Sequence, residues 1–178
     1  TDPVSGQTTA GFWTQATGWV SIGWLPTAFT GCGTISSPYD ISGDGTTIIG
    51  LSWDGCSGRG FKWDAANGML ALEGLANGQN RASTIAADGS LIVGFAQGDF
   101  NRTPASWLPD LSGSVIDSTL QGEYYGTTDD GSILTGTIYN GGIHFQAFTA
   151  SNQGGFNFMG TLDPDWGATA ADISENGE

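Results

Sequence analysis

Apolar and polar residues alternate along this chain in short stretches that glycine-rich turns separate. The clearest example lies within residues 60–96, where four such stretches follow one another: GFKWD, MLALEGL, ASTIAAD and SLIVGFA. Alternation with a period of two over so few residues predicts half-buried β-strands. The turns that join them, AANG and the pair Asp88-Gly89, predict antiparallel hairpins of type I′, in which both central residues take a positive φ.

This pattern of four strands recurs along the chain. In each copy an Asp-Gly or Asn-Gly pair joins the third stretch to the fourth, and the glycines of these pairs are Gly45, Gly89, Gly131 and Gly177. The steps between them are 44, 42 and 46 residues, which is the period of a propeller blade. The fourth stretch of the first three copies also contains a glycine, where we expect another backbone or an aromatic ring to approach closely: Gly50, Gly94 and Gly136.

The sequence therefore predicts an all-β protein, a β-propeller or a propeller-like array of four-stranded antiparallel blades. We expect a single repeat domain over residues 1–178, with blades at about 10–54, 55–98, 99–140 and 141–178. The last blade of this division lacks its fourth strand. Either residues 1–7 supply that strand or the native chain continues with further copies.

The repeat resembles a known family. RGFKWDAANGMLALEGLANGQNRASTIAADGSLIVGFA (59–96) is similar to the HAF repeat of bacterial extracellular proteins, in which a His-Ala-Phe-x-Trp motif precedes a glycine turn, Leu-Gly-x-Leu and an Ile-x-x-Asp-Gly-x-Val-Val-Gly segment. The resemblance covers nearly the whole chain, although AGFW, RGFKW and PASW replace the triplet and the last copy has HFQAF. It implies a propeller-like repeat and an extracellular, cell-surface or periplasmic location, and it implies no established chemistry.

Composition narrows the classes of partner. The chain has 30 glycines, 7 tryptophans and only 12% charged residues, as expected for short strands joined by many turns. Its net charge of −14 repels nucleic acid, so we expect no nucleic-acid partner. No stretch approaches the roughly 20 apolar residues of a membrane helix, and we expect no direct membrane insertion.

Strand order separates the polar residues between two faces. In an up-and-down blade, the turns after the first and third strands lie on one face, which aspartates make acidic: Asp44, Asp64, Asp88, Asp110, Asp129 and Asp130. The other connections lie on the opposite face, where arginines and aromatic residues suit a binding surface. The candidate binding residues there are Arg59, Arg81, Arg102, Phe100, Tyr124, Tyr125 and Trp166. Strand alternation predicts that one of the two adjacent tyrosines belongs to the core.

The two cysteines, Cys32 and Cys56, fall in connections of this second face, and we expect them to form a disulfide, which favours an oxidising compartment. We expect no cofactor. A calcium ion on the aspartates of the hairpin turns is the alternative, with Asp44, Asp88 and Asp130 as ligands. The only histidine, His144, has no nucleophile elbow to serve, so we expect a structural role for it.

These observations favour a non-catalytic extracytoplasmic propeller that binds a protein partner, an envelope complex or a polysaccharide. One alternative is a structural repeat segment of a longer surface protein, such as an autotransporter. Another is an enzyme that cleaves polysaccharides with paired carboxylates, for which Asp163 and Asp165 or Asp129 and Asp130 are the candidates.

Overall fold

The computed structural model describes residues 6–26, 33–53, 56–75, 78–97, 102–139, 141–142 and 144–178. β1 (Ala10–Thr14) and β2 (Gly18–Gly23) form a hairpin, and the first sheet contains β3 (Ser36–Ile41), β4 (Thr47–Trp53), β5 (Gly58–Asp64) and β6 (Gly68–Ala71). The second sheet contains β7 (Asn80–Ile85), β8 (Ile92–Gln97), β9 (Arg102–Trp107) and β10 (Gly113–Val115). The third contains β11 (Gln121–Thr127), β12 (Ile133–Tyr139), β13 (Phe145–Ser151) and β14 (Gly154–Gly160). Within these described ranges no helix has the length and hydrophobicity of a membrane span.

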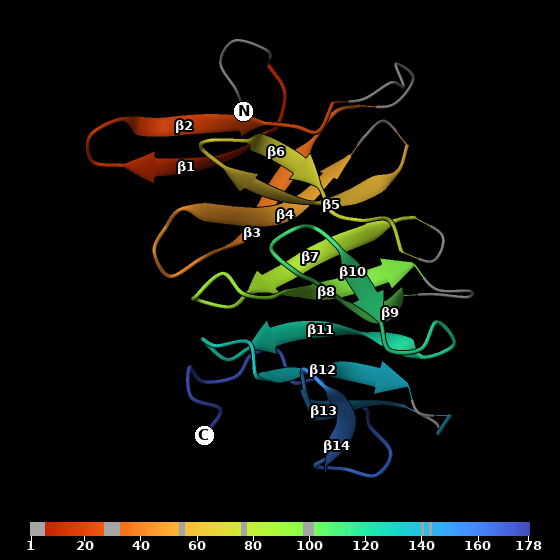
Figure 1. Ribbon diagram of the computed structural model, residues 1–178. Helices are drawn as coiled ribbons and strands as arrows, with labels where there is room; N and C mark the ends of the chain where they lie inside the picture. The colour runs from red at the N-terminus through yellow and green to blue at the C-terminus, as the bar shows by residue number, and fades with distance from the viewer. Residues whose placement is uncertain are drawn as a thin grey trace.

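The sheets follow one another in chain order as a stack, with the two termini at opposite ends of it (Figure 1). Strands within each sheet are antiparallel and lie side by side in the order of the sequence. The first strands of successive sheets, β3, β7 and β11, contact one another from sheet to sheet. The sheets therefore approach along one edge, as the innermost strands of neighbouring propeller blades do. The all-β class with four-stranded antiparallel sheets is confirmed.

The sheets differ from the expected blades by half a repeat. Each sheet begins with the third strand of one sequence copy and ends with the second strand of the next, so the sheets span 36–71, 80–115 and 121–160. The boundaries expected at 54, 98 and 140 fall instead at links inside a sheet, because a repeat period fixes the spacing of strands and not the gap at which one sheet ends.

Because of this shift, the third sheet has all four of its strands, β11 to β14. That the last sequence copy lacks its fourth strand stays a prediction. The N-terminal segment expected to supply that strand lies, for residues 1–5, outside the described residues. The segment after the third sheet lies beside β12, where the Ala170 amide donates to the Gly136 carbonyl at 3.3 Å and the Thr137 hydroxyl donates to the Ala168 carbonyl at 3.2 Å.

The core lies between successive sheets. Ile49 and Leu72 of the first sheet pack with Ile92 and Trp107 of the second in one cluster of buried residues. A second cluster joins the second and third sheets and contains Tyr124 and Phe148 among others. Each fully buried large side chain contributes about 1.5–3 kcal/mol of transfer free energy, so the sheets stabilise one another face to face.

A β-bulge recurs in the first strand of each four-stranded sheet. The pairing with the next strand skips one residue each time, and these residues are Tyr39, Ser83 and Tyr125. One of the predicted glycines lies opposite each bulge. No larger residue fits there, because a Cβ at Gly94 would collide with the carbonyl oxygen of Arg81 and one at Gly136 with that of Glu123. The close backbone approach expected at these glycines is confirmed, and the bulge turns one side chain per repeat toward the common edge.

The hairpin turns are not of type I′. Gly45, Gly89 and Gly131 have φ values of 72°, 74° and 69°, whereas Leu111 is the only residue other than glycine with a positive φ among the described residues. The preceding aspartates therefore keep an ordinary negative φ, and the turn closes with a hydrogen bond from the glycine amide, such as that from Gly45 to Ser42 at 2.8 Å. Glycine alone supplies the left-handed conformation, since only it takes this conformation without steric cost.

Candidate functional site

Antiparallel pairing gives the stack two different ends. At the turn end lie the hairpin turns that join the first strand to the second and the third to the fourth within each sheet, such as β3 to β4 and β5 to β6. At the connection end lie the links from the second to the third strand and the connections between sheets. Arg59, Arg81 and Arg102 lie at or near the start of β5, β7 and β9, which places all three at the connection end, as the sequence predicts.

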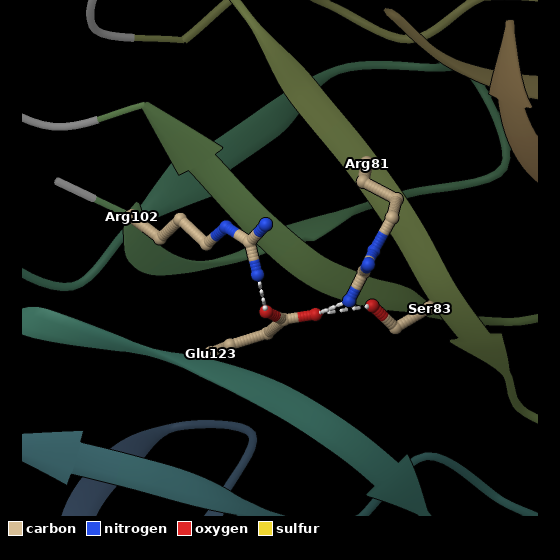
Figure 2. Close-up of polar contacts among 4 residues, drawn as sticks. All are labelled: Arg81, Ser83, Arg102 and Glu123. Carbon is tan, nitrogen blue, oxygen red and sulfur yellow. Dashed lines mark hydrogen bonds and ion pairs between the residues drawn. The ribbon is translucent and has the colours of Figure 1, made fainter. Parts of the chain in front are cut away.

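At this end one carboxylate accepts hydrogen bonds from two arginines. Glu123 of β11 accepts a hydrogen bond from Arg81 of β7, and its other oxygen accepts one from Nη1 of Arg102 of β9 at 3.0 Å (Figure 2). The hydroxyl of Ser83, the residue turned by the β7 bulge, donates to the same carboxylate at 3.0 Å. Arg81, Ser83 and Arg102 belong to the second sheet and Glu123 to the third, so this network joins neighbouring sheets.

The members of the network differ in exposure. The side chain of Glu123 is 2% exposed, that of Arg81 is 18% exposed and that of Arg102 is 53% exposed. Burial lowers the pKa of Arg81 from its usual value, but a guanidinium stays protonated at any physiological pH. Two positive charges therefore face one negative charge, and the surplus lies on the arginine that solvent reaches.

Aromatic rings hold both guanidinium groups in place. The Arg81 guanidinium carbon lies 5.0 Å from the centre of the Tyr39 ring and 5.1 Å from that of Phe95. The guanidinium carbon of Arg102 lies 4.4 Å from the centre of the same Phe95 ring. Cation–π contacts of this kind stabilise by about 0.5–2 kcal/mol and restrict the rotamers of a long side chain.

A groove of about 470 Å³ opens beside this network. Arg102 and Glu123 of the network line it together with residues of β11, β12, β13 and the segment after β14. The lining residues are Arg102, Gln121, Gly122, Glu123, Tyr125, Thr137, Phe145 and Thr169. The Phe145 ring is 43% exposed, so the groove combines a cation, hydroxyl and amide groups, and an aromatic surface.

The structure brings together some of the predicted binding residues. Arg81, Arg102 and Tyr125 belong to the network or line the groove. Arg59 belongs to neither. Its Nη1 lies beside Gly74 in the connection that follows β6, 3.0 Å from the position that a Cβ on that glycine would take. Phe100 lies outside the described residues.

Two further aromatic predictions have different outcomes. Tyr124 as a binding residue is wrong, because it is 2% exposed and packs edge to face on Phe148 with ring centres 5.7 Å apart. Burial raises the pKa of its hydroxyl, and the expectation that one of the adjacent tyrosines belongs to the core is confirmed. Trp166 is 71% exposed but lines a separate cavity of about 200 Å³ with His144 and Pro164.

Sequence reasoning missed Glu123, the residue that organises the site. It stands eight positions before Gly131, as Arg81 stands eight before Gly89. The two residues therefore occupy the same repeat position on successive sheets, and there the basic Arg81 meets the acidic Glu123. A comparison of the copies position by position would have paired them.

The aspartates of the turn end have local partners. Asp44 Oδ1 accepts hydrogen bonds from the Ser42 hydroxyl at 2.7 Å and from the Thr46 amide at 2.9 Å. Hydrogen bonds from the side chain and backbone of Ser132 and from Thr128 lower the pKa of Asp130 to about 2. Among the described residues no group of three or more histidine, cysteine, aspartate or glutamate residues is placed to hold a metal ion. A calcium role for Asp44, Asp88 and Asp130 stays a prediction.

Asp163, Asp165 and Cys56 are not among the residues that line the groove. Asp163 and Asp165 are both exposed in one turn, where the Asp165 amide donates to Asp163 Oδ1 at 2.9 Å. Cys56 is disulfide-bonded, and its predicted partner Cys32 lies outside the described residues.

Comparison with solved structures gives the architecture a name. A putative TolB from Agrobacterium tumefaciens is similar to 85% of this chain over 52% of its own length, with a TM-score of 0.57 and 16% sequence identity. TolB from Acinetobacter baumannii is similar to 80% of this chain over 34% of its own length, with a TM-score of 0.53 and 18% identity. The fold is that of β-propeller blades.

The chain spans about half the length of the first of these propellers and a third of the second. No protein-family model and no curated protein sequence matches it. At these identities the comparison establishes the propeller fold, and the groove at the connection end carries the functional argument.

Proposed function

We propose that this chain is a non-catalytic, extracytoplasmic propeller module that binds a protein partner through the groove at the connection end. The observation that carries the proposal is the concentration of basic and aromatic groups there. The chain has 4 basic and 18 acidic residues, yet two of the basic ones meet on one carboxylate beside an exposed phenylalanine. Arginine and aromatic side chains dominate the binding energy of protein interfaces.

The proposed location has separate support. Disulfides persist in oxidising compartments, and Cys56 takes part in one. The two solved structures compared above are of TolB proteins, and an envelope-associated propeller is the comparison that the proposal uses. The resemblance of the repeats to the HAF repeat of bacterial extracellular proteins also supports a location outside the cytoplasm.

The architecture also suits a binding role. Propeller blades place their variable loops at the two ends of a rigid stack, so that residues from different blades meet without helices or lids between them. In this chain the groove takes residues from β9, β11, β12, β13 and the segment after β14. A rigid site of this kind loses little conformational entropy when a partner docks.

The proposal is tested by photocrosslinking from two positions. A benzophenone amino acid replaces Gln121 in the groove or Thr46 at the turn end, and each protein is incubated with an envelope extract of the source cells. We expect a discrete crosslinked protein from the groove position, and its loss when Phe145→Ala is added. Crosslinks from the turn end alone, or equal crosslinks from both positions, would contradict the proposal.

A further inference from the structure

The network beside the groove carries more positive than negative charge, because Arg81 and Arg102 share the single carboxylate of Glu123. Glu123 is the only acidic residue among the described residues that line the groove. That carboxylate is 2% exposed and already accepts hydrogen bonds from Arg81, Ser83 and Arg102. A buried carboxylate that already pairs with two guanidinium groups is not available to a further cation, so the site favours an anion over a cation.

Arg102 is the group that a ligand would meet. Its Nη1 donates to Glu123 and its guanidinium lies on the Phe95 ring, which fixes the plane of the group. A guanidinium carries five N–H donors in a rigid fork, and with 53% of its side chain exposed Arg102 retains donors that open to the groove. Such a fork matches the two oxygens of a carboxylate.

Phe145 also lines the groove and offers an apolar surface to the same ligand. The Phe145 ring is 43% exposed and lies 5.7 Å, centre to centre, from the ring of Tyr139. Tyr125, which the pairing of β11 with β12 skips, and Gln121 add polar groups to the lining. A ligand that contacts both Arg102 and Phe145 therefore combines a carboxylate with an apolar group.

We propose that the groove binds an acidic peptide segment of the partner protein, with a carboxylate on Arg102 and the neighbouring apolar side chain on Phe145. This inference rests on the proposed function and adds the chemistry that the partner presents. The chain carries a net charge of −14, so an acidic segment is repelled elsewhere and attracted at this end, which fixes its position. A peptide supplies an acidic and an apolar side chain together, whereas an acidic sugar offers only the smaller apolar face of its ring beside the carboxylate.

The test is a fluorescence anisotropy titration with three probes. The first is a fluorescein-labelled, amidated Glu-Phe-Glu-Phe peptide, the second is the same peptide with glutamine for glutamate, and the third is a labelled trigalacturonate. Each is titrated against the wild-type chain and against Arg102→Gln, Arg102→Lys, Phe145→Ala and Arg59→Gln. Arg59→Gln is the matched control, because it removes one positive charge from the same end without lining the groove.

We expect the glutamate peptide to bind at least about tenfold more tightly than the glutamine peptide, because a charge-assisted hydrogen bond is lost with the carboxylate. Arg102→Gln weakens binding of the glutamate peptide by about tenfold and abolishes its preference over glutamine, and Arg102→Lys retains part of it. Phe145→Ala weakens both peptides, and Arg59→Gln changes neither by more than about twofold. Near-ultraviolet circular dichroism of the tryptophans confirms that each variant is folded.

Other results would overturn the inference in distinguishable ways. Equal binding of both peptides, lost in Phe145→Ala, would show a docking groove that does not recognise carboxylates, and the proposed function would stand without the inference. Tighter, Arg102-dependent binding of trigalacturonate would replace the peptide by an acidic sugar. No binding of any probe at about 1 mM would contradict the acidic peptide outright, and the crosslinking experiment would then decide whether the groove binds protein at all.

Discussion

The two ends of the stack are built from the same strands but follow different rules. At the turn end every copy repeats one device, an aspartate, or Asn176 in the last copy, that accepts hydrogen bonds from its own turn, as Asp44 does from Ser42 and Thr46. At the connection end one repeat position holds a different residue in each copy: Ser37, Arg81, Glu123 and Thr169. The repeated residues maintain the blades, and the departures from the repeat create the groove.

The two ends also differ in how their polar groups depend on other sheets. The turn aspartates are exposed and bonded within a few residues, so each turn is independent of its neighbours apart from backbone contacts such as that from the Gly43 amide to the Ala87 carbonyl at 2.8 Å. Glu123 is buried, and its partners belong to the neighbouring sheet. Substitutions should therefore have large effects at the connection end and small ones at the turn end.

The largest effect is expected for Glu123→Gln. This change leaves Arg81 with most of its side chain buried and without its negative partner, and breaking a buried pair in this way costs about 3 kcal/mol of unfolding free energy. Urea denaturation measures the cost, with Ser83→Ala as a control that removes one neutral donor and costs about 1 kcal/mol. Equal and small losses for the two variants would show that the network contributes little to joining the sheets.

A second contrast concerns glycine. Gly94→Ala places a methyl group against the carbonyl oxygen of Arg81 opposite the bulge, and such overpacking costs about 2–3 kcal/mol. Gly45→Ala at the turn end meets no atom within 4 Å and pays only for its positive φ, about 1 kcal/mol. Thermal unfolding of the two variants compares them directly. A larger loss for the turn variant would mean that the bulge can shift to relieve the collision.

The smallest effect is the pH dependence of the turn end. The pKa of Asp130 is lowered to about 2 from its ordinary value of 3.8, so its hydrogen bonds stabilise the folded protein above the higher value and the contribution is lost as the pH falls through the lower one. A nuclear magnetic resonance titration of the Asp130 carboxyl group gives the midpoint, and Ser132→Ala should raise it. A midpoint near the ordinary value for aspartate would mean that the turn does not hold the carboxylate in solution.

The sequence predicted the blade strands well because turns and alternation are local properties. The glycines at 50, 94 and 136 were also interpretable, since a conserved spacing inside a strand indicates close backbone approach. The residues at which each sheet begins and ends were not predictable in the same way. The link after β4 and the link after β6 are both short loops in the sequence, and only the second of them ends a sheet.

The site was predicted only in part. Arg81 and Arg102 follow from strand order, because loops at one end of a blade stack share a face. The burial of Tyr124 against Phe148 depends on the bulge that turns Tyr125 outward, and a bulge is invisible to simple alternation. Glu123 escaped notice because a single acidic residue inside a strand is unremarkable until its place next to Arg81 on the neighbouring sheet is known.

The central claim is that this propeller acts through its connection end. The most direct measurement is the affinity of the crosslinked partner, once purified, for the wild-type chain, for Arg102→Gln and for a turn-end variant that combines Asp44→Asn, Asp88→Asn and Asp130→Asn. We predict a loss of about tenfold or more for Arg102→Gln and a change within about twofold for the turn-end variant. Loss of affinity in the turn-end variant, with full affinity in Arg102→Gln, would contradict the claim.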